Sequence, residues 1–461
     1  MEIGKVKVEV AKLAKSKGID VQSAWDIFFF DEVLLRLSKS RYRKSFVIKG
    51  GFYLQSIVGV ETRSTMDIDF KFIGNELSAE ELKRIFTEIC LDSNEDNISF
   101  EIISVDDITA ETKYGGKTIK VDARFFNIRK RFGIDIGIGD VVTPYPIEYE
   151  YGLSFKKDED CKLLAYTIES MMAEKFETLI SKGMQNSRSK DLFDLYLLSK
   201  ENYDIENLNV AMINTFNLRG TEYSKEKIIK SLDETFGFDR IRFLYENYSK
   251  KNAFAKEVTF DMCRNAVYDL FQKLHFERGI SLSDYDVELD LLRHGENEHD
   301  KLGGWSDSHL TENGKKDIGE LLPKIEKYDL FISSDLNRAR ETSEIINGKL
   351  GMGIIYDEGF REMNNGNLKD MSKFEFENLS KDYRFSSLEI NQRYPGGESP
   401  NEFYERVKEK FLGLLEKNKG KKILLVTHAG VITAILCVLN GYKYSNKLLI
   451  APHVGCLMRL H

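Results

Sequence analysis

The last third of the chain alternates short apolar strands with segments of helical periodicity, and this pattern leaves few folds open to it. The apolar runs are VELDLL, DLFISS and KKILLVT, and the segment after each has helical spacing of its apolar residues. Such alternation predicts a doubly wound sheet with helices on both faces. Ligands bind these sheets at the carboxyl ends of the strands. One histidine, His294, follows the first run and another, His428, follows the third. We therefore expect both side chains to face one pocket.

The residues around these histidines suit phosphoryl transfer. A neutral imidazole can attack phosphorus and hold the phosphoryl group covalently, which splits one difficult displacement into two. Arg293 precedes His294, and Arg338 lies at the start of a helical segment. The planar guanidinium fork donates paired hydrogen bonds to phosphoryl oxygens. Glu362, in FREMNNG, could protonate the leaving alkoxide and then activate water.

Six segments between residues 286 and 461 resemble the histidine phosphatase (phosphoglycerate mutase-like) superfamily, in family order: LLRHGE, GWSDSHLTENG, SSDLNRARET, FREMNNG, YPGGES and VTHAG. The resemblance implies that His294 is the phosphorylated nucleophile and Glu362 the proton donor. It also implies that Arg293, Arg338 and His428 bind the phosphoryl group, with no cofactor. We favour a phosphatase over a mutase because no obvious sequence feature demands a bisphosphate.

Three residues depart from this family pattern. Asp300 stands where an asparagine is usual, and Lys369-Asp370 stand where an acidic residue and a glycine are usual. These positions concern the substrate class more than the reaction type. The resemblance also assigns a backbone turn beside the phosphate to Gly295 and an orienting role to Thr427.

The first part of the chain carries a second set of chemical residues. Lys49-Gly50-Gly51 closes a predicted strand and opens a helix, where backbone N–H groups can meet phosphate. In RSTMDID, Asp67 and Asp69 have strand spacing, so both carboxylates face the same side. With a third carboxylate from a neighbouring strand they can hold Mg²⁺. We predict Asp135 as the third, with Asp122 as the alternative.

The segments KGGFYL, RSTMDIDF, IDIGIGDVVTP and AEKFETLISKGMQNSRSKDLFDLYLL resemble the AbiEii-like toxin branch of the nucleotidyltransferase superfamily. The resemblance implies Mg²⁺ held by Asp67, Asp69 and Asp135. It also implies a set of nucleotide-binding residues: Gly50, Gly51, Arg63, Lys175, Arg188, Lys190, Asp191 and Asp194.

The chain has 461 residues, which predicts more than one domain. We expect an α/β two-domain protein. Residues 1–275 are expected to form a nucleotidyltransferase-type mixed sheet with a helical extension. Residues 276–285 form a linker, and residues 286–461 form a doubly wound α/β/α sheet of the phosphoglycerate mutase type. No apolar run approaches the roughly 20 residues that cross a bilayer, and scattered cysteines fit buried free thiols in a cytoplasmic protein. The basic cluster Arg41, Arg43, Lys44 and Lys49 is interpreted as solvated surface.

These observations predict a bifunctional enzyme. The first domain transfers a nucleoside monophosphate from an NTP to an acceptor, and the second hydrolyses a phosphate monoester, as consecutive steps on a small molecule. The main alternative is a toxin or phage-defence nucleotidyltransferase that acts on RNA such as tRNA, with a regulatory phosphatase domain. In a further alternative, one domain is an inactive nucleotide- or phospho-ligand-binding module.

Overall fold

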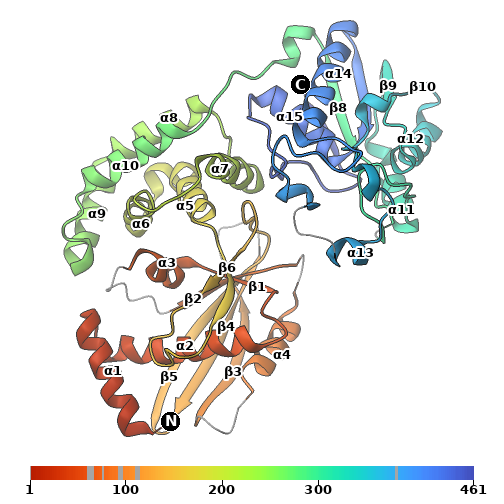
Figure 1. Cartoon of the computed structure of the whole chain (residues 1–461). Helices are drawn as coiled ribbons and strands as arrows, with labels where there is room; N and C mark the ends of the chain where they lie inside the picture. Colours follow the sequence, from red (N-terminus) through yellow and green to blue (C-terminus); the bar gives the residue numbers. More distant parts are fainter. Residues whose placement is uncertain are drawn as a thin grey trace. The chain divides into compact units, whose positions relative to one another are not determined.

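The computed structural model describes residues 2–59, 67–74, 77–91, 97–108, 115–298, 300–378 and 383–460. The chain forms two compact units, Met1–Leu274 and His275–His461 (Figure 1). Both contain a sheet and helices, which confirms the predicted α/β two-domain class. The predicted domain limits stay a prediction.

The first unit contains a seven-stranded mixed sheet of order β3-β4-β5-β2-β1-β7-β6. Pairs β2/β5 and β1/β7 are parallel and the other pairs antiparallel. The strands are β1 (Phe46–Lys49), β2 (Asp67–Phe72), β3 (Ile98–Asp107), β4 (Gly116–Phe125), β5 (Ile128–Gly137), β6 (Ile147–Glu150) and β7 (Lys162–Ala165). The helices are α1 (Ile3–Lys17), α2 (Val21–Lys39), α3 (Gly50–Val58), α4 (Ala79–Ile89), α5 (Ile168–Lys182), α6 (Ser189–Leu198), α7 (Ile205–Arg219), α8 (Lys225–Phe236), α9 (Asp239–Lys251) and α10 (Phe260–Lys273).

The two faces of this sheet differ in character. Helix α2 packs on one face through aromatic side chains: the Phe28 ring lies 5.1 Å from that of Phe125, and the Phe30 ring 5.1 Å from that of Phe132. Successive strand residues point to opposite faces, so Asp135 on β5 lies on the face away from α2. The sequence alternation therefore separates an apolar core face from a polar face.

Side-chain caps explain where several helices begin. Asp20 accepts from the backbone N–H of Ser23 at the start of α2, at 2.9 Å, and Thr167 caps α5 in the same way. Ser78 and Glu81 form a complete capping box at α4. Each such contact satisfies a backbone donor that the helix itself leaves open.

The second unit contains a five-stranded sheet of order β10-β9-β11-β8-β12. Strands β8 to β11 run parallel, as predicted, whereas β12 pairs antiparallel with β8 at one edge. The strands are β8 (Glu288–Arg293), β9 (Leu330–Ser333), β10 (Ile354–Tyr356), β11 (Lys422–Thr427) and β12 (Leu457–Leu460). The helices are α11 (Glu312–Leu321), α12 (Asn337–Leu350), α13 (Lys373–Asn378), α14 (Pro400–Lys417) and α15 (Ala429–Asn440).

Apolar side chains of β8, β9 and β11 form the core of this unit with α11 and α12. Leu292, Phe331 and Leu424 are fully buried against Ile318 and Ile346 of those helices. The carboxyl ends of the three strands lie side by side, because Thr427 pairs with Arg293 and Val426 with Ser333 in the register.

The segment predicted as a linker packs within the second unit. The N–H of Ile280 donates to the carbonyl of Val438 at 3.3 Å, and Leu282 is buried. A Cβ at Gly279 would overlap the backbone of Leu439, so this close approach requires glycine. Among the described residues, no helix has the length and apolar character needed to cross a membrane.

Candidate active sites

The sheet of the second unit brings the two predicted histidines together. His294 directly follows β8 and His428 directly follows β11, and the backbone N–H of His294 donates to the carbonyl of Thr427 at 3.0 Å. The two ring centroids lie 5.2 Å apart, and both side chains are buried. The two histidine rings therefore lie beside each other at the carboxyl ends of adjacent strands.

The hydrogen bonds of His294 prepare one ring nitrogen for attack. Nδ1 lies 2.8 Å from the carbonyl oxygen of Gly295, an acceptor, so this nitrogen carries the proton. Nε2 is therefore unprotonated, and its lone pair accepts a hydrogen bond from Nε of Arg338 at 3.3 Å. Burial, followed by the positive charges of Arg338 and Arg293, holds the pKa of His294 well below its usual range. The imidazole is neutral near pH 7, as a nucleophile requires.

Among the described residues, both arginines of the site donate to backbone carbonyls rather than to carboxylates. Arg338 donates to the carbonyl of Gly304 at 2.7 Å and Arg293 to that of Pro452 at 2.9 Å. Within the described ranges, neither forms an ion pair with a carboxylate. Burial lowers the pKa of Arg338 to about 10 and also lowers that of Arg293.

Two buried nitrogens of this pocket lack a hydrogen-bond partner among the described residues: Nε of Arg293 and Nδ1 of His428. Leaving a buried polar group unsatisfied costs about 1–3 kcal/mol. A bound anion with several acceptor oxygens, such as a phosphoryl group, would supply the missing acceptors.

The carboxylate of Glu362 lies at the start of helix α15. Its Oε1 accepts from the N–H of Met363 and its Oε2 from the N–H of Gly430, both at 3.1 Å. A Cβ at Gly430 would overlap this carboxylate, so glycine is needed at that position. The charge of Glu362 acts on both Arg293 and Arg338, which places it beside the same pocket.

In the first unit, four polar residues form a row across the polar face of the sheet. The register pairs Thr118 with Asp135, Asp135 with Asp69, and Asp69 with Lys49, on four adjacent strands. The hydroxyl of Thr118 donates to Oδ1 of Asp135 at 2.6 Å. Residues paired in this way lie on one face and about 5 Å apart across the strands. Asp69 and Asp135 are thus adjacent carboxylates.

The register distinguishes the two candidates for the third carboxylate. Asp122 pairs with Arg131, four residues from Asp135 along β5, and its carboxylate is bound by that arginine at 2.8 Å. Asp135 is therefore the carboxylate beside Asp69. Asp67 lies on β2, but its side chain is outside the described part of the chain, as is the whole of Arg63.

The glycine turn after β1 lies against Asp69. Gly50 has a φ of 75°, and a Cβ there would overlap the carboxylate of Asp69. Gly50 and Gly51 are the first residues of α3, so their N–H groups have no acceptor within the helix. The predicted phosphate-binding turn is thus next to a predicted metal ligand.

Helices α5 and α6 bring three of the other predicted residues together. The ammonium of Lys175 contacts Asp191 at 3.0 Å and Asp194 at 2.6 Å. Although burial raises it, the Lys175 charge leaves the pKa of Asp191 below its usual value. By contrast, the side chains of Arg188 and Lys190 are exposed, and no described side-chain contact joins them to this group.

Comparison with known proteins assigns each unit to a family. Residues 32–262 match the family described as nucleotidyl transferase AbiEii toxin, Type IV TA system, which is half of the chain. Residues 289–461 match the histidine phosphatase superfamily (branch 1). The phosphoglycerate mutase-like protein 4 of Arabidopsis thaliana is 34% identical over 162 residues, which cover 33% of this chain and 70% of that protein.

The chain belongs to both families. It is an enzyme with a nucleotidyltransferase domain and a histidine phosphatase domain. Among solved structures, a phosphoglycerate mutase from Thermus thermophilus is 32% identical and covers 37% of this chain and 91% of that one, with a TM-score of 0.30. A mycobacterial glucosyl-3-phosphoglycerate phosphatase in complex with VO3 is 24% identical. The match covers 37% of this chain and 91% of that one, with a TM-score of 0.34. The assignment rests on the family matches and the sequence relative, because these TM-scores are low.

In the phosphatase domain, sequence reasoning missed the residues that support Glu362. The indole N–H of Trp305 donates to the carbonyl of Glu362 at 2.7 Å, and the Arg361 guanidinium lies 4.7 Å from the Trp305 ring centroid. Thr427, to which the family resemblance already assigned an orienting role, donates to the carbonyl of Phe360 at 2.8 Å and so holds the same loop. Trp305 lies within GWSDSHLTENG, and its aromatic character was the available signal.

The departures from the family pattern lie on the loops of this domain. Asp300 is exposed, and Oδ1 of Asp370 accepts from the N–H of Asp307 at 2.8 Å. Asp370 therefore ties the FREMNNG loop to the loop that carries Trp305.

In the nucleotidyltransferase domain, sequence reasoning missed a buried ion network. The ammonium of Lys49 contacts Asp140 and, at 3.2 Å, Glu174 on α5. Arg219 on α7 reaches the same two carboxylates at 3.8 and 3.6 Å, and Glu177 at 2.8 Å. The interpretation of Lys49 as solvated surface is wrong, because its side chain is only 16% exposed. The network joins the sheet to the helical extension.

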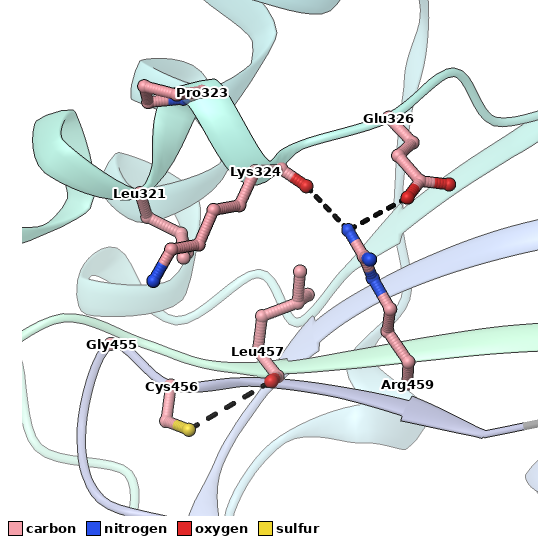
Figure 2. Close-up of a pocket in the computed structure, with 8 residues that line it drawn as sticks. All are labelled: Leu321, Pro323, Lys324, Glu326, Gly455, Cys456, Leu457 and Arg459. Carbon is pink, nitrogen blue, oxygen red and sulfur yellow. Dashed lines mark hydrogen bonds and ion pairs between the residues drawn. The ribbon is translucent and has the colours of Figure 1, made fainter.

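A hollow of about 700 Å³ opens elsewhere in the phosphatase domain, beside edge strand β12 (Figure 2). It is lined by Leu321, Pro323, Lys324, Glu326, Gly455, Cys456, Leu457 and Arg459. Arg459 already pairs with Glu326 at 2.9 Å and donates to the Lys324 carbonyl at 2.6 Å. The hollow contains none of the predicted catalytic residues, although the carbonyl of Cys456 accepts from the N–H of Arg293.

Proposed function

We propose that the phosphatase domain hydrolyses phosphate monoesters through a phosphohistidine at His294. The observation that carries this proposal is a buried cluster around the neutral imidazole of His294. Among the described residues, it contains two arginines without carboxylate partners and two nitrogens without a hydrogen-bond partner. An anion with several oxygens suits this pocket, and the imidazole suits attack on its phosphorus.

The first half of the reaction transfers the phosphoryl group to the enzyme. Its oxygens accept from Arg293, Arg338 and His428, and Arg338 thereby leaves Nε2 of His294. Nε2 attacks phosphorus, a P–N bond forms and the P–O bond to the leaving group breaks. Glu362, in its protonated form, gives its proton to the leaving alkoxide and becomes a carboxylate. In the second half, Glu362 takes a proton from water, the resulting hydroxide attacks phosphorus and the P–N bond breaks. No cofactor is required.

The surrounding charges support monoester hydrolysis over a mutase reaction. Two further arginines lie near Glu362, but the Arg361 guanidinium pairs with Asp335 and that of Arg406 with Glu398. A second phosphate on the substrate would need cations that remain available. Of these four arginines, only Arg293 and Arg338 form no ion pair within the described residues, and the transferring phosphoryl group would occupy both.

We propose that the nucleotidyltransferase domain transfers a nucleoside monophosphate from an NTP to a hydroxyl acceptor. The adjacent carboxylates of Asp69 and Asp135 fit Mg²⁺, an ion that proteins commonly hold through one or two carboxylates together with substrate phosphates. Asp67 would complete the set. Bound there, Mg²⁺ supplies charge neutralisation and lowers the pKa of the attacking hydroxyl.

The residues of this chain bind and orient the nucleotide. The N–H groups of Gly50 and Gly51 would donate to the triphosphate, and Lys175 would contact it from α5. The acceptor oxygen attacks the α-phosphorus, and the bond to the departing pyrophosphate breaks. We propose that the acceptor is a small molecule and that the two domains act on it one after the other, in the cytoplasm. An RNA acceptor such as tRNA is the second candidate, since the matching family is described as a toxin.

One experiment tests both activities and separates the acceptors. The full chain is incubated with Mg²⁺, each α-labelled NTP and either total tRNA or a panel of small phosphorylated and hydroxylated acceptors, followed by mass analysis. Asp69→Asn should abolish labelling and leave hydrolysis of an aryl phosphate intact, whereas His294→Ala should do the reverse. Label on tRNA alone would refute the consecutive scheme, and full hydrolysis by His294→Ala would refute the phosphohistidine.

A further inference from the structure

Ser334 makes a buried contact with the second histidine of the phosphatase pocket. It directly follows β9, and its Oγ lies 2.7 Å from Nε2 of His428. Both side chains are fully buried. Strands β9 and β11 are adjacent, and the N–H of Ser334 donates to the carbonyl of Val426 at 2.9 Å. The sheet itself therefore fixes this contact.

The surrounding hydrogen bonds set its direction. Oγ of Ser334 accepts from the N–H of Leu336 at 3.4 Å. A hydroxyl has one proton to donate, and Nε2 of His428 is the acceptor found for it within the described residues. In the opposite arrangement, Nε2–H would donate to Oγ and the buried serine proton would lose its acceptor, at a cost typical of an unsatisfied polar group.

The direction of this bond determines the tautomer of His428. If Nε2 accepts, the single proton of the neutral ring lies on Nδ1. Nδ1 is the buried nitrogen that lacks a partner among the described residues, on another edge of the ring from Ser334. A protonated Nδ1 can donate to a phosphoryl oxygen, whereas an unprotonated one would present a lone pair to a negative group.

We propose that Ser334 is a positioning residue of the phosphatase, whose hydroxyl donates to Nε2 of His428 and so keeps on Nδ1 the proton that His428 donates to the phosphoryl group. This inference rests on the proposed function, because it requires His428 to bind the transferring group. Ser334 itself touches no reacting atom. Its effect on the reaction passes through the orientation and tautomer of the imidazole.

The test compares variants of the full chain, with an aryl phosphate as substrate and inorganic phosphate as competitive inhibitor. Ser334→Ala should lower kcat/KM and weaken inhibition by phosphate about 5- to 10-fold each, as expected for loss of one hydrogen bond in the site. Ser334→Thr, which keeps the hydroxyl, should stay within about twofold of the parent.

Ser333→Ala is the matched control. Ser333 is an equally buried serine one residue earlier, but its hydroxyl bonds to Ser343 and to the carbonyl of Ser334. Its loss should lower the melting temperature without changing kcat/KM. Adding Ser334→Ala to a His428→Gln chain should cost nothing further, since the residue through which Ser334 acts is already gone.

The tautomer can also be measured without changing Ser334. In the ¹⁵N-histidine-labelled chain, His428 is assigned by the signals lost in His428→Gln, and its nitrogen shifts should show the proton on Nδ1. A proton on Nε2 would overturn the proposal. So would a loss of kcat/KM in Ser334→Ala that is no greater than the loss in Ser333→Ala, or one that is equally large in the His428→Gln background. Activity in His294→Ala would instead remove the proposed function itself.

Discussion

Replacing Lys49 by methionine tests the buried ion network of the nucleotidyltransferase domain. The change keeps an unbranched side chain but removes the ammonium that contacts Asp140 and Glu174, which are only 18% and 19% exposed. Removing one partner of a buried ion pair costs about 3–5 kcal/mol, because the remaining charge stays buried without compensation. Arg219 still reaches both carboxylates, so we expect a loss in free energy of unfolding near the lower end, about 3 kcal/mol.

The two tryptophans of the chain make this loss measurable for one domain. Trp25 lies in the first unit and Trp305 in the second, so in a Trp305→Phe background the fluorescence of buried Trp25 reports urea unfolding of the first unit. Lys39→Met is the control, since it makes the same charge change at an exposed pair with Glu159. It should cost less than about 1 kcal/mol. Equal losses in both variants would refute the reasoning that burial gives the Lys49 network its strength.

Two further predictions concern proton positions. Glu362→Gln should lower kcat on alkyl phosphates by about 10²-fold or more but affect activated aryl phosphates much less, because only poor leaving groups need a proton; equal losses on both would show that Glu362 is not the general acid. Burial raises the pKa of Asp31 to about 7, against hydrogen bonds from the N–H groups of Ser154 and Phe155. Since the folded-state value lies above the unfolded one, Asp31 stabilises the fold at low pH, and this contribution is lost as pH rises toward 7. The difference in unfolding free energy between Asp31→Asn and the parent should therefore shift by about 2–3 kcal/mol in favour of the variant from pH 5 to pH 8, measured through Trp25. A difference that stays constant with pH would contradict this.

The character of each face of the first sheet follows from strand periodicity. In β5 the alternation of apolar residues with Asp135 is a local property of the sequence, and it places Asp135 on the polar face. The pairing of Asp69 with Asp135 is different, because β2 and β5 are separated by two strands in the chain and lie side by side only in the folded sheet. Sequence spacing could offer both Asp135 and Asp122, and only the register distinguishes them.

Helix length and buried charge were harder to predict. Helix α5 ends at Lys182, where Gly183 follows with a φ of 48°, and α6 begins at Ser189. Lys49 was grouped with basic neighbours in the sequence, but its partners Asp140 and Glu174 are far along the chain. Local composition cannot show that a lysine at a strand end is neutralised by residues about 90 and 125 positions away.

The cationic side chains of the two domains differ in their partners. This difference affects how each site would bind its substrate. In the nucleotidyltransferase domain, Lys49 and Lys175 are each held by two carboxylates, so their charge is balanced before any nucleotide binds. Contact between Lys175 and a triphosphate therefore requires exchange of one set of anionic partners for another. In the described part of the phosphatase pocket, Arg293 and Arg338 donate only to uncharged carbonyls and to the ring of His294. Among the described residues, the charge of Glu362 acts on both arginines without forming an ion pair with either, so a bound anion would add the counter-charge that they lack. In the proposed reaction, the phosphatase site would therefore bind its anion without such an exchange, and donors arranged in advance stabilise charge on a transferring phosphoryl group.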